Sequence, residues 1–368
     1  MLFKILIIGS TGKLGIKLLN FAKSNKIPID AITCNKNKNL LIKQANNHNI
    51  KNIFHYNNAT DIHENNSFLK YISKNKLKIV YFLDHGSGSL NILSEILNHQ
   101  KNTFIAIANK EMIIAGNNFM IKEIKKTNNI FIPLDSEHFS LINNNLNNNE
   151  IEKIYITASG GPFYSNKKIN LNKVNQIDVL SHPKWKMGKN NLIDSSNFIN
   201  KILEIFELSI IFNIDISKID FLVSTPAYAH SIVKYYDNIT TVNCFNNDML
   251  ITLTKPLRYF YNFNLKIKKT FFLNSDNYTF EPFNDQRFKI IKYIKKLKKL
   301  NHSNQIKFMI LNNLAQKKYL ENKLPYNHIV NFIMANLKFK NSKVNLRSFH
   351  EICEYVKFLK KEYNFDNA

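Results

Sequence analysis

The sequence predicts an α/β protein: a doubly wound open sheet in the N-terminal third, then a central α+β part and a helical C-terminal part. Three observations predict this fold. Short apolar runs alternate with amphipathic stretches up to about residue 133, as in a parallel sheet covered by helices on both faces. A glycine-rich turn, residues 9–15, follows the first apolar run. From about residue 285 onward, apolar residues recur with helical spacing.

The strands of the first sheet are expected to be continuous apolar runs, because such a sheet is buried on both faces. They are residues 3–8, 29–33, 52–55, 78–83, 103–107 and 130–133. Amphipathic helices are expected between them, including residues 13–23, 90–99 and 117–126. This alternation predicts a Rossmann-like sheet, in which ligands bind at the carboxyl ends of the strands.

The middle of the chain is expected to form a second domain of helices and strands. Residues 158–191 are long and hold glycine, proline and the only tryptophan, and a loop of that length is usually functional. A helix over residues 194–211 is expected, with Asp194 or Ser195 as its cap. The other expected elements are a polar loop at residues 143–150 and strands at residues 151–157, 221–223 and 240–245.

The C-terminal part is expected to be helical, after a connection without periodicity. The helices are predicted at residues 288–297, 305–320, 326–337 and 346–363. The predicted domains are a nucleotide-type domain at 1–134, a catalytic domain at 135–263 with a mobile loop at 159–189, a linker at 264–283, and a helical domain at 284–368.

Composition excludes several classes of protein. With 368 residues, 44% of them hydrophobic, the chain can bury a core and is not globally disordered. No apolar run approaches the roughly 18 residues that cross a bilayer, and the first residues match neither a signal peptide nor a transit peptide. Three widely spaced cysteines exclude a disulfide scaffold. We therefore expect a cytoplasmic protein with no membrane partner.

The net charge of +24 raises the question of nucleic-acid binding. Only three of the 51 basic residues are arginine, the residue preferred for bidentate contacts with phosphates and bases. The chain is also rich in Asn, Ile, Phe and Tyr, which share A/T-rich codons with Lys. We attribute the charge to a bacterial genome rich in A+T and expect no specific nucleic-acid partner, although the field would still attract an anionic substrate.

Residues 9–15, G-S-T-G-K-L-G, join the first strand to the first helix. Glycines let the backbone approach a pyrophosphate, and the helix N-terminus offers free N–H donors. The second strand ends without the acid that would bind the ribose hydroxyl of NAD. Lys36 and Asn37 stand there instead and can hold a 2′-phosphate. The sequence therefore predicts NADP(H). The alternative for residues 9–15 is a tight turn that binds no ligand, and the alternative for Lys36 is a surface lysine without a specific role.

Acidic residues follow the last strand of the first sheet and recur on the later helix. Asp135 and Glu137 are expected at the carboxyl edge of the sheet. Lys201 and Glu204 are three residues apart, a spacing that puts both on one face of the later helix. The three acids can form an oxygen-rich site for Mg²⁺ or Mn²⁺. The alternatives are helix capping by Asp135 and Glu137 and a solvated ion pair between Lys201 and Glu204, with Glu207 as another partner for Lys201.

Hydrogen-bond donors that suit a phosphate monoester stand just after the strand expected at residues 151–157 and in the first part of the helix expected over residues 194–211. They are Ser159, Ser195, Asn200 and Lys201. Between them, residues 182–188, H-P-K-W-K-M-G, carry the only tryptophan. A lid that closes over substrate and excludes water is the functional interpretation, and an ordinary surface loop is the alternative.

Together these segments resemble the family of 1-deoxy-D-xylulose 5-phosphate reductoisomerases, enzymes of the methylerythritol phosphate route to isoprenoids that depend on NADPH and a divalent metal. Beyond about residue 210 the match is mainly one of layout. Six motifs in the family's order carry the resemblance: residues 9–15, 108–111, 133–138, 159–163, 182–188 and 194–204.

The resemblance implies an NADP-dependent oxidoreductase that converts 1-deoxy-D-xylulose 5-phosphate to 2-C-methyl-D-erythritol 4-phosphate as a homodimer. It implies a divalent cation (Mn²⁺, Mg²⁺ or Co²⁺) held by Asp135, Glu137 and Glu204. The implied catalytic residues are Lys110, Asp135, Glu137, His182 and Glu204. The implied substrate contacts are Lys110, Ser136, Glu137, Ser159, His182, Trp185, Ser195, Asn200, Lys201 and Glu204. The implied cofactor contacts are Gly9, Ser10, Thr11, Gly12, Lys13, Leu14, Lys36, Asn37, Asn109, Glu111 and Gly188, with Met187 on the cofactor side.

The chain departs from the family's pattern at several positions. Residues 224–227 read S-T-P-A where the family has H-P-Q-S, although His230 remains. Residues 247–250 read N-D-M-L in place of P-D-M-R, and an Asn-Glu pair reads Ala315 and Gln316. The first-turn serine is Lys13, and a glycine after the second strand is Asn35.

These departures keep two other readings open. One is a decayed, non-catalytic homologue, which the intact acids oppose because an acid cluster is unfavourable without a cation. The other is a different NADPH oxidoreductase, such as a semialdehyde or homoserine dehydrogenase. A semialdehyde dehydrogenase would need a nucleophilic cysteine, and Cys244 lacks a suitable context for that role.

Overall fold

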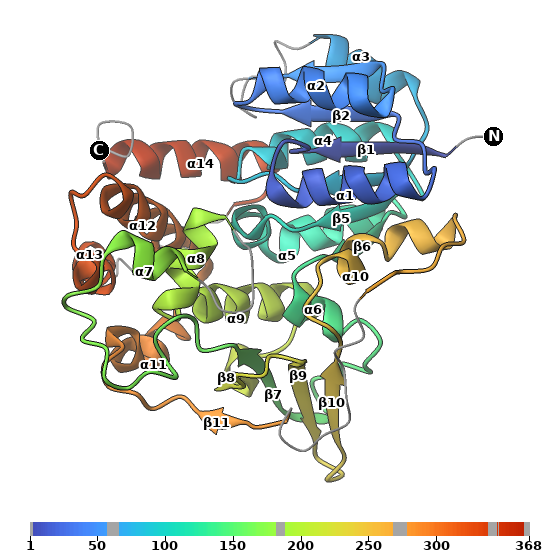
Figure 1. Ribbon diagram of the computed structural model, residues 1–368. Helices are drawn as coiled ribbons and strands as arrows, with labels where there is room; N and C mark the ends of the chain where they lie inside the picture. Colours follow the sequence, from blue (N-terminus) through green and yellow to red (C-terminus); the bar gives the residue numbers. More distant parts are fainter. Residues whose placement is uncertain are drawn as a thin grey trace. The chain divides into compact units, whose positions relative to one another are not determined.

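The computed structural model describes residues 3–56, 66–181, 188–267, 278–337, 344 and 346–363. The chain, coloured along its sequence in Figure 1, divides into two compact units. The first unit is Met1–Phe139, Asp248–Lys268 and Leu346–Glu354, and the second unit is Ser140–Asn247, Lys269–Asn345 and Tyr355–Ala368. The three predicted domain boundaries stay predictions.

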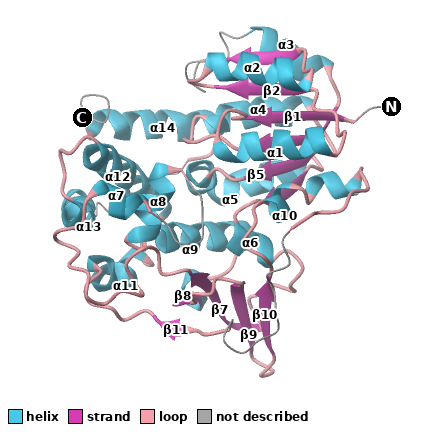
Figure 2. Cartoon of the chain, viewed as in Figure 1, coloured by secondary structure: helices cyan, strands magenta, loops and turns pink. Residues whose placement is uncertain are grey.

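The first unit is built on a six-stranded sheet with the strand order β3-β2-β1-β4-β5-β6. Every neighbouring pair in this sheet is parallel. The order reverses between β1 and β4, which makes the sheet doubly wound and confirms the Rossmann-like prediction. Figure 2 shows its strands in magenta with cyan helices against them. The strands are β1 (Lys4–Ile8), β2 (Ala31–Cys34), β3 (Asn52–His55), β4 (Leu77–Phe82), β5 (Phe104–Ile107) and β6 (Ile130–Pro133).

Burial explains why the central strands read as unbroken apolar runs. Residues 5–8 of β1 are fully buried, and β5 is buried along its whole length. The edge strand β3 is only partly buried, because one of its sides has no neighbouring strand. The helices that begin in this unit are α1 (Lys13–Ser24), α2 (Lys38–His48), α3 (Asn66–Lys74), α4 (Ser89–His99), α5 (Lys110–Lys126), α6 (Ser136–Ser140), α10 (Leu250–Leu253) and α14 (Phe349–Glu362).

The helix expected at residues 117–126 is longer than predicted, because α5 begins at Lys110. Asn109 caps it by accepting a hydrogen bond from the backbone N–H of Met112 at 3.0 Å. Asn117 has a φ of +48°, so the helix is kinked there. The apolar pattern detected only the part after the kink.

The second unit is built on a five-stranded sheet with the order β10-β9-β7-β8-β11. β7 and β8 are parallel, and the other pairs are antiparallel. The strands expected at residues 151–157, 221–223 and 240–245 are confirmed, whereas β9 was not predicted. The strands are β7 (Ile151–Ala158), β8 (Ile219–Val223), β9 (Ala229–Tyr235), β10 (Thr240–Cys244) and β11 (Glu281–Pro282).

The single helix predicted over residues 194–211 is wrong, because the structure has two: α8 (Lys189–Ser196) and α9 (Ile199–Phe212). Asp194 and Ser195 therefore lie inside α8 and cap neither helix. Phe198 separates the helices with a φ of +66°, a conformation that is rare for a bulky residue. Its ring packs on those of Phe283 and Phe288, with centroids 4.2 and 4.8 Å apart, so aromatic packing holds the break.

The remaining helices of the second unit include those expected near the C-terminus. Among the described residues, no helix has the length and apolar character needed to cross a membrane. These helices are α7 (Gln176–Leu180), α11 (Ile294–Leu297), α12 (His302–Leu320) and α13 (Ile329–Asn336).

Candidate active site

The glycines of the first turn have different reasons to be glycine. A Cβ on Gly9, where φ is +83°, would lie 2.6 Å from the backbone nitrogen of Asp84, and a Cβ on Gly15 would overlap the backbone of Ser10. Gly12 is different, because its nearest neighbour would lie 3.4 Å away. Gly9 and Gly15 therefore allow close packing, whereas Gly12 leaves the front of the turn open.

The N-terminus of α1 has the properties of an anion-binding site. Gly12 is its N-cap and makes no side-chain capping bond, and the first turn holds no acidic residue. The N–H groups at the start of a helix and the helix dipole favour a phosphate group at such a position. Ser10 is fully buried. Its hydroxyl donates to the side-chain oxygen of Gln44 at 2.8 Å, its N–H donates to the carbonyl of Thr33 at 3.0 Å, and its carbonyl accepts from the amide of Gln44 at 2.9 Å, so Ser10 shapes the turn and its predicted contact with the cofactor stays a prediction.

The end of β2 carries the residues predicted to choose between NADP and NAD. Asn37 caps α2 by accepting from the N–H of Leu40 at 3.0 Å, and the first turn of α2 holds no acid. Lys36 is exposed beside it. A cation and a helix N-terminus whose first turn holds no acid favour a phosphate over a ribose hydroxyl here.

Asn109 ties the ends of β4 and β5 together at the carboxyl edge of the sheet. Its amide donates to the carbonyl of Gly86 at 3.0 Å and to the carboxylate of Asp84 at 3.3 Å. Asp84 also accepts a hydrogen bond from the hydroxyl of Ser89. Burial raises the pKa of Asp84, and the hydrogen bonds from Ser89 and Asn109 oppose that rise. Sequence reasoning missed Asp84, which belongs to none of the six motifs.

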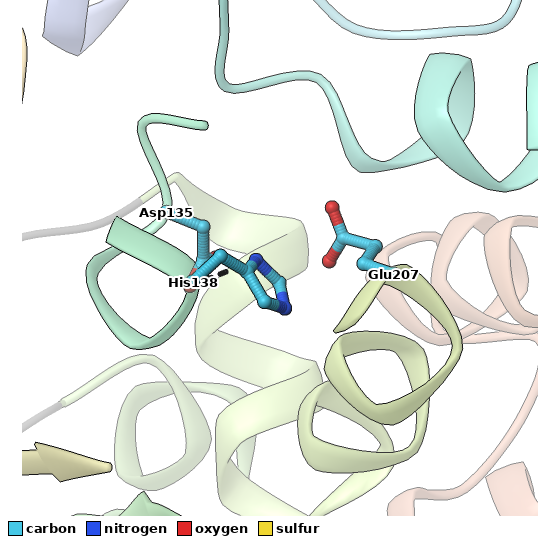
Figure 3. Close-up of side chains that lie close together, drawn as sticks. All are labelled: Asp135, His138 and Glu207. Carbon is cyan, nitrogen blue, oxygen red and sulfur yellow. Dashed lines mark ion pairs between the residues drawn. The ribbon is translucent and has the colours of Figure 1, made fainter. Parts of the chain in front are cut away.

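The acids after β6 gather with two basic side chains of the same unit. Asp135 forms an ion pair with Lys110 and accepts from the N–H of Glu137 at 3.3 Å, so the capping alternative is present in the geometry. Ser136 donates to the carboxylate of Glu137 at 2.5 Å. His138 is fully buried, and its Nδ1 atom lies 3.8 Å from a carboxylate oxygen of Asp135. A dashed line marks this ion pair in Figure 3. His138 was not predicted, although its spacing of three residues from Asp135 was the available signal.

The acids of α9 are buried, which contradicts the alternative of a solvated ion pair. The side chain of Glu204 is 2% exposed, that of Lys201 is 8% exposed, and their charged atoms lie 2.5 Å apart. Asn200 donates to the other carboxylate oxygen of Glu204. Glu207, also drawn in Figure 3, is buried one turn further along the helix. Burial of charged groups is costly unless they are paired, so this helix face has a role beyond solubility.

The residues predicted to hold a phosphate lie in one unit, where two of their motifs meet. Ser159 follows β7, and the turn after it places Gly161 against α8: a Cβ on Gly161 would lie 2.8 Å from the carbonyl oxygen of Ser195. Asn200 and Lys201 occupy the first turn of α9, two residues beyond the end of α8. The turn at residues 159–163 therefore packs on the helix that carries Ser195.

Asp194, next to Ser195, explains one departure from the family pattern. Its buried carboxylate accepts from the amide of Asn312 at 2.9 Å and from that of Gln316 at 2.6 Å. Gln316 stands where the family has a glutamate. An amide at this position donates to Asp194, whereas a second carboxylate would repel it unless one of the two were protonated.

The loop predicted to act as a lid is described only at its edge. His182, Trp185 and Met187 lie outside the described residues. Gly188 is the N-cap of α8, and a Cβ there would meet no atom of the described residues within 4 Å.

The structure thus groups the predicted residues into two sets. The first unit holds the glycine turn, Lys36, Asn37 and residues 109–111, together with Asp135, Ser136 and Glu137. The second unit holds Glu204 and the predicted phosphate ligands. The three-acid metal site draws on both units and stays a prediction, as do the roles of the individual residues.

Two sequence models of known families match the chain. One, described as 1-deoxy-D-xylulose 5-phosphate reductoisomerase, matches residues 5–117, and the other, described as the C-terminal domain of that enzyme, matches residues 131–212. The chain is 34% identical to 1-deoxy-D-xylulose 5-phosphate reductoisomerase of Pelagibacter ubique, over 96% of this chain and 97% of the relative. It is 30% identical to the enzyme of the same name from Clostridium novyi, over 98% and 99% of the two chains.

Solved structures show the same fold. A DOX-P reductoisomerase in complex with NADPH, fosmidomycin and magnesium superposes with a TM-score of 0.85, at 21% identity, over 99% of this chain and 98% of the other. The Zymomonas mobilis enzyme in complex with NADPH gives a TM-score of 0.80, at 20% identity, over 98% of each chain.

Proposed function

The chain belongs to the 1-deoxy-D-xylulose 5-phosphate reductoisomerase family, and on this premise we propose that it converts 1-deoxy-D-xylulose 5-phosphate to 2-C-methyl-D-erythritol 4-phosphate with NADPH and a divalent cation. The observation that carries the proposal is the buried carboxylate of Glu204, which shares one helix face with the predicted phosphate ligands Asn200 and Lys201. An acid for a metal and donors for a phosphate thus lie within two turns of α9.

The first unit binds the cofactor in this proposal. The open turn at Gly12 and the N–H groups of α1 receive the pyrophosphate, while Lys36 and the N-terminus of α2 receive the 2′-phosphate. When bound, NADPH supplies the hydride that reduces the aldehyde. Asn109, tied to Gly86 and Asp84, fixes the neighbouring strand ends against which the cofactor lies.

Asp135, Glu137 and Glu204 are the residues that would hold the cation. Three carboxylates suit a hard cation such as Mg²⁺ or Mn²⁺. When bound, the cation supplies Lewis acidity that polarises the substrate's oxygens. Lys110 and Lys201 each offset the charge of one of these acids, which limits the repulsion among carboxylates that must approach one another.

In this proposal the protein orients the substrate by binding its phosphate group. Ser159, Ser195, Asn200 and Lys201 hold that group, which takes no part in bond breaking. Binding energy from a non-reacting group lowers the barrier by fixing the reacting carbons in place. Residues 182–188 close over the substrate and exclude water while the carbon skeleton rearranges and the resulting aldehyde is reduced.

We further propose that the protein works in the cytoplasm as a homodimer, as the family resemblance implies. Sedimentation velocity tests the assembly, because a dimer has twice the 43.1 kDa mass of the chain. A single species at the mass of one chain would contradict the dimer and leave the proposed reaction untouched.

The experiment that tests the reaction follows NADPH absorbance with deoxyxylulose phosphate and Mn²⁺ or Mg²⁺. We expect oxidation that needs both substrate and metal. Glu204→Gln should lower kcat/KM by roughly 100-fold or more, because Lewis-acid stabilisation of the transition state is worth several kcal/mol. Glu152→Gln is the matched control, because Glu152 pairs with Lys234 at a partly exposed site and should keep full activity.

Two outcomes would redirect the proposal. Absence of NADPH oxidation with any divalent ion would favour the decayed homologue. A loss on Glu207→Gln but not on Glu204→Gln would move the metal ligand one turn along α9.

A further inference from the structure

We propose that Arg287 is a positioning residue for substrate binding: its guanidinium holds residues 163–170, the segment that joins the Ser159 turn to the predicted lid. This inference rests on the proposed function. Arg287 is the only arginine in the sequence of the second unit, and it forms no hydrogen bond or ion pair with any predicted site residue that the structure describes.

The guanidinium binds the main chain of this segment at several points. Its Nη1 atom donates to the carbonyl of Asn166 at 2.9 Å and reaches that of Ile169 at 3.5 Å. Its Nη2 atom donates to the carbonyls of Phe163 and Tyr164 at 3.3 and 3.4 Å. One side chain thus contacts four carbonyls within the seven residues 163–169, which fixes the path of the backbone between them.

Charged contacts hold the guanidinium in place. Asp285 accepts from Nε and Nη2 of Arg287, with the shortest contact at 2.8 Å, and also pairs with Lys167 at 3.0 Å. These hydrogen bonds, chiefly that from Arg287, hold the pKa of Asp285 well below its usual range. Tyr164 adds a second tie by donating to Glu281 at 2.8 Å. Residues 281–287 and the 163–170 segment are therefore joined by a network and not by one bond.

The arrangement requires arginine. A guanidinium presents five N–H donors in a rigid plane, so it can bind a carboxylate on one edge and carbonyls on the other. A lysine offers three donors at a single point. In a chain whose basic residues are otherwise almost all lysine, the guanidinium at this position is used for its geometry and not merely for its charge.

The segment lies between two parts of the proposed site. On one side it begins two residues after Gly161, which packs on the backbone of Ser195, and its first residue, Phe163, is buried. On the other side it leads to α7 and then to the predicted lid, residues 182–188. Loosening the segment should therefore weaken binding of the substrate phosphate and change NADPH binding little, because nearly all predicted NADPH contacts lie in the first unit.

The kinetic test compares Arg287→Ala and Arg287→Lys with Arg258→Ala. Arg258 is the matched control, because it is exposed in the first unit and stacks only on Phe263. Both Arg287 variants should raise the KM for deoxyxylulose phosphate about tenfold, as expected for the loss of charged hydrogen bonds, while the KM for NADPH stays within about twofold. Millimolar guanidinium should restore part of the substrate affinity of Arg287→Ala, whereas methylammonium should not.

A second readout does not depend on activity. Lys167, Lys168 and Lys173 are exposed in and just after the segment, so a lysine-specific protease can report how firmly it is held. Cleavage after these lysines should be several-fold faster in Arg287→Ala than in the wild type, and unchanged in Arg258→Ala. If the wild type is cleaved slowly after these lysines but shows no turnover, the proposed function has failed and the positioning role fails with it. The result would still show that Arg287 holds residues 163–170 in place.

Asp285→Asn provides a route if Arg287→Ala does not fold, since it keeps the arginine and loses only its anchoring charge. We expect a smaller change in the same direction for both the substrate KM and the cleavage rate. Wild-type substrate KM and cleavage in Arg287→Lys would overturn the proposal, because charge alone would then suffice. Equal losses for substrate and NADPH would also overturn it, by showing a general structural role.

Discussion

Asp84 is the residue whose charge bears most directly on the predicted cofactor turn. Its backbone packs against Gly9, and its carboxylate accepts from Ser89 and Asn109. Burial raises its pKa, so the fold favours the protonated form. An ionised carboxylate here would also repel the pyrophosphate that the turn is proposed to receive.

The sign of the pH dependence follows from this raised pKa. A carboxyl with a raised folded pKa contributes stability that is fully present below its unfolded pKa of about 3.9 and is lost as pH rises through the folded value. Asp84→Asn cannot ionise, so its Tm should gain on the wild type as pH rises from 4 to 8. Its NADPH affinity should also exceed that of the wild type at pH 8.

Thermal scans across that range, with NADPH titrations at each end, measure both effects. Ser89→Ala is the control, because it removes a donor that stabilises the ionised form and should increase the pH dependence. A Tm difference between Asp84→Asn and the wild type that does not change with pH would show that Asp84 does not titrate in this range.

At the scale of elements, the turn between β1 and α1 separates packing from binding. A Cβ on Gly15 would overlap the backbone of Ser10, whereas a Cβ on Gly12 would touch nothing closer than 3.4 Å. Gly15→Ala should therefore lower the Tm by several degrees, since the backbone must shift to relieve the overlap. Gly12→Ala should keep the wild-type Tm and lose NADPH affinity about tenfold or more, because its methyl group occupies the front of the turn.

Thermal scans and NADPH titration of the two variants provide the test, and each variant is the control for the other. If Gly12→Ala binds NADPH as the wild type does, the cofactor does not pass over Gly12, and the predicted cradle is misplaced.

The elements also show what the sequence could and could not predict. The bounds of the strands in the first sheet were predicted to within two residues, because burial on both faces leaves continuous apolar runs in the sequence. The break between α8 and α9 could not be predicted, since it depends on Phe198 taking a positive φ for the sake of aromatic contacts with Phe283 and Phe288. Those partners lie some 85 residues further along the chain, beyond the reach of local pattern.

The candidate site divides in the same way. Motif residues such as Asp135 and Glu204 were found because their types and spacing have a chemical meaning. Arg287 and Asp84 were not, because each acts through backbone atoms or neighbours that come together only on folding.

At the scale of the whole molecule, the two units hold different parts of the proposed site. The cofactor turn, Asp135 and Glu137 belong to the first unit, and Glu204 belongs to the second. NADPH, whose predicted contacts other than Met187 and Gly188 all lie in the first unit, should therefore stabilise the protein without Glu204, whereas a cation that needs all three acids must engage both units. A ligand at 100 times its Kd stabilises the folded state by about 2.7 kcal/mol, which is a shift of several degrees in Tm for a chain of this size.

Two variants separate these effects in thermal scans with saturating Mn²⁺ or NADPH. Glu204→Gln should lose the shift caused by Mn²⁺ and keep the shift caused by NADPH, because its change lies in the second unit and only the cation needs that acid. Gly12→Ala should do the reverse. A full Mn²⁺ shift in Glu204→Gln would mean that Asp135 and Glu137 bind the cation without the second unit. The proposed chemistry requires the cation beside α9, which carries the predicted phosphate ligands Asn200 and Lys201, and would then have no basis.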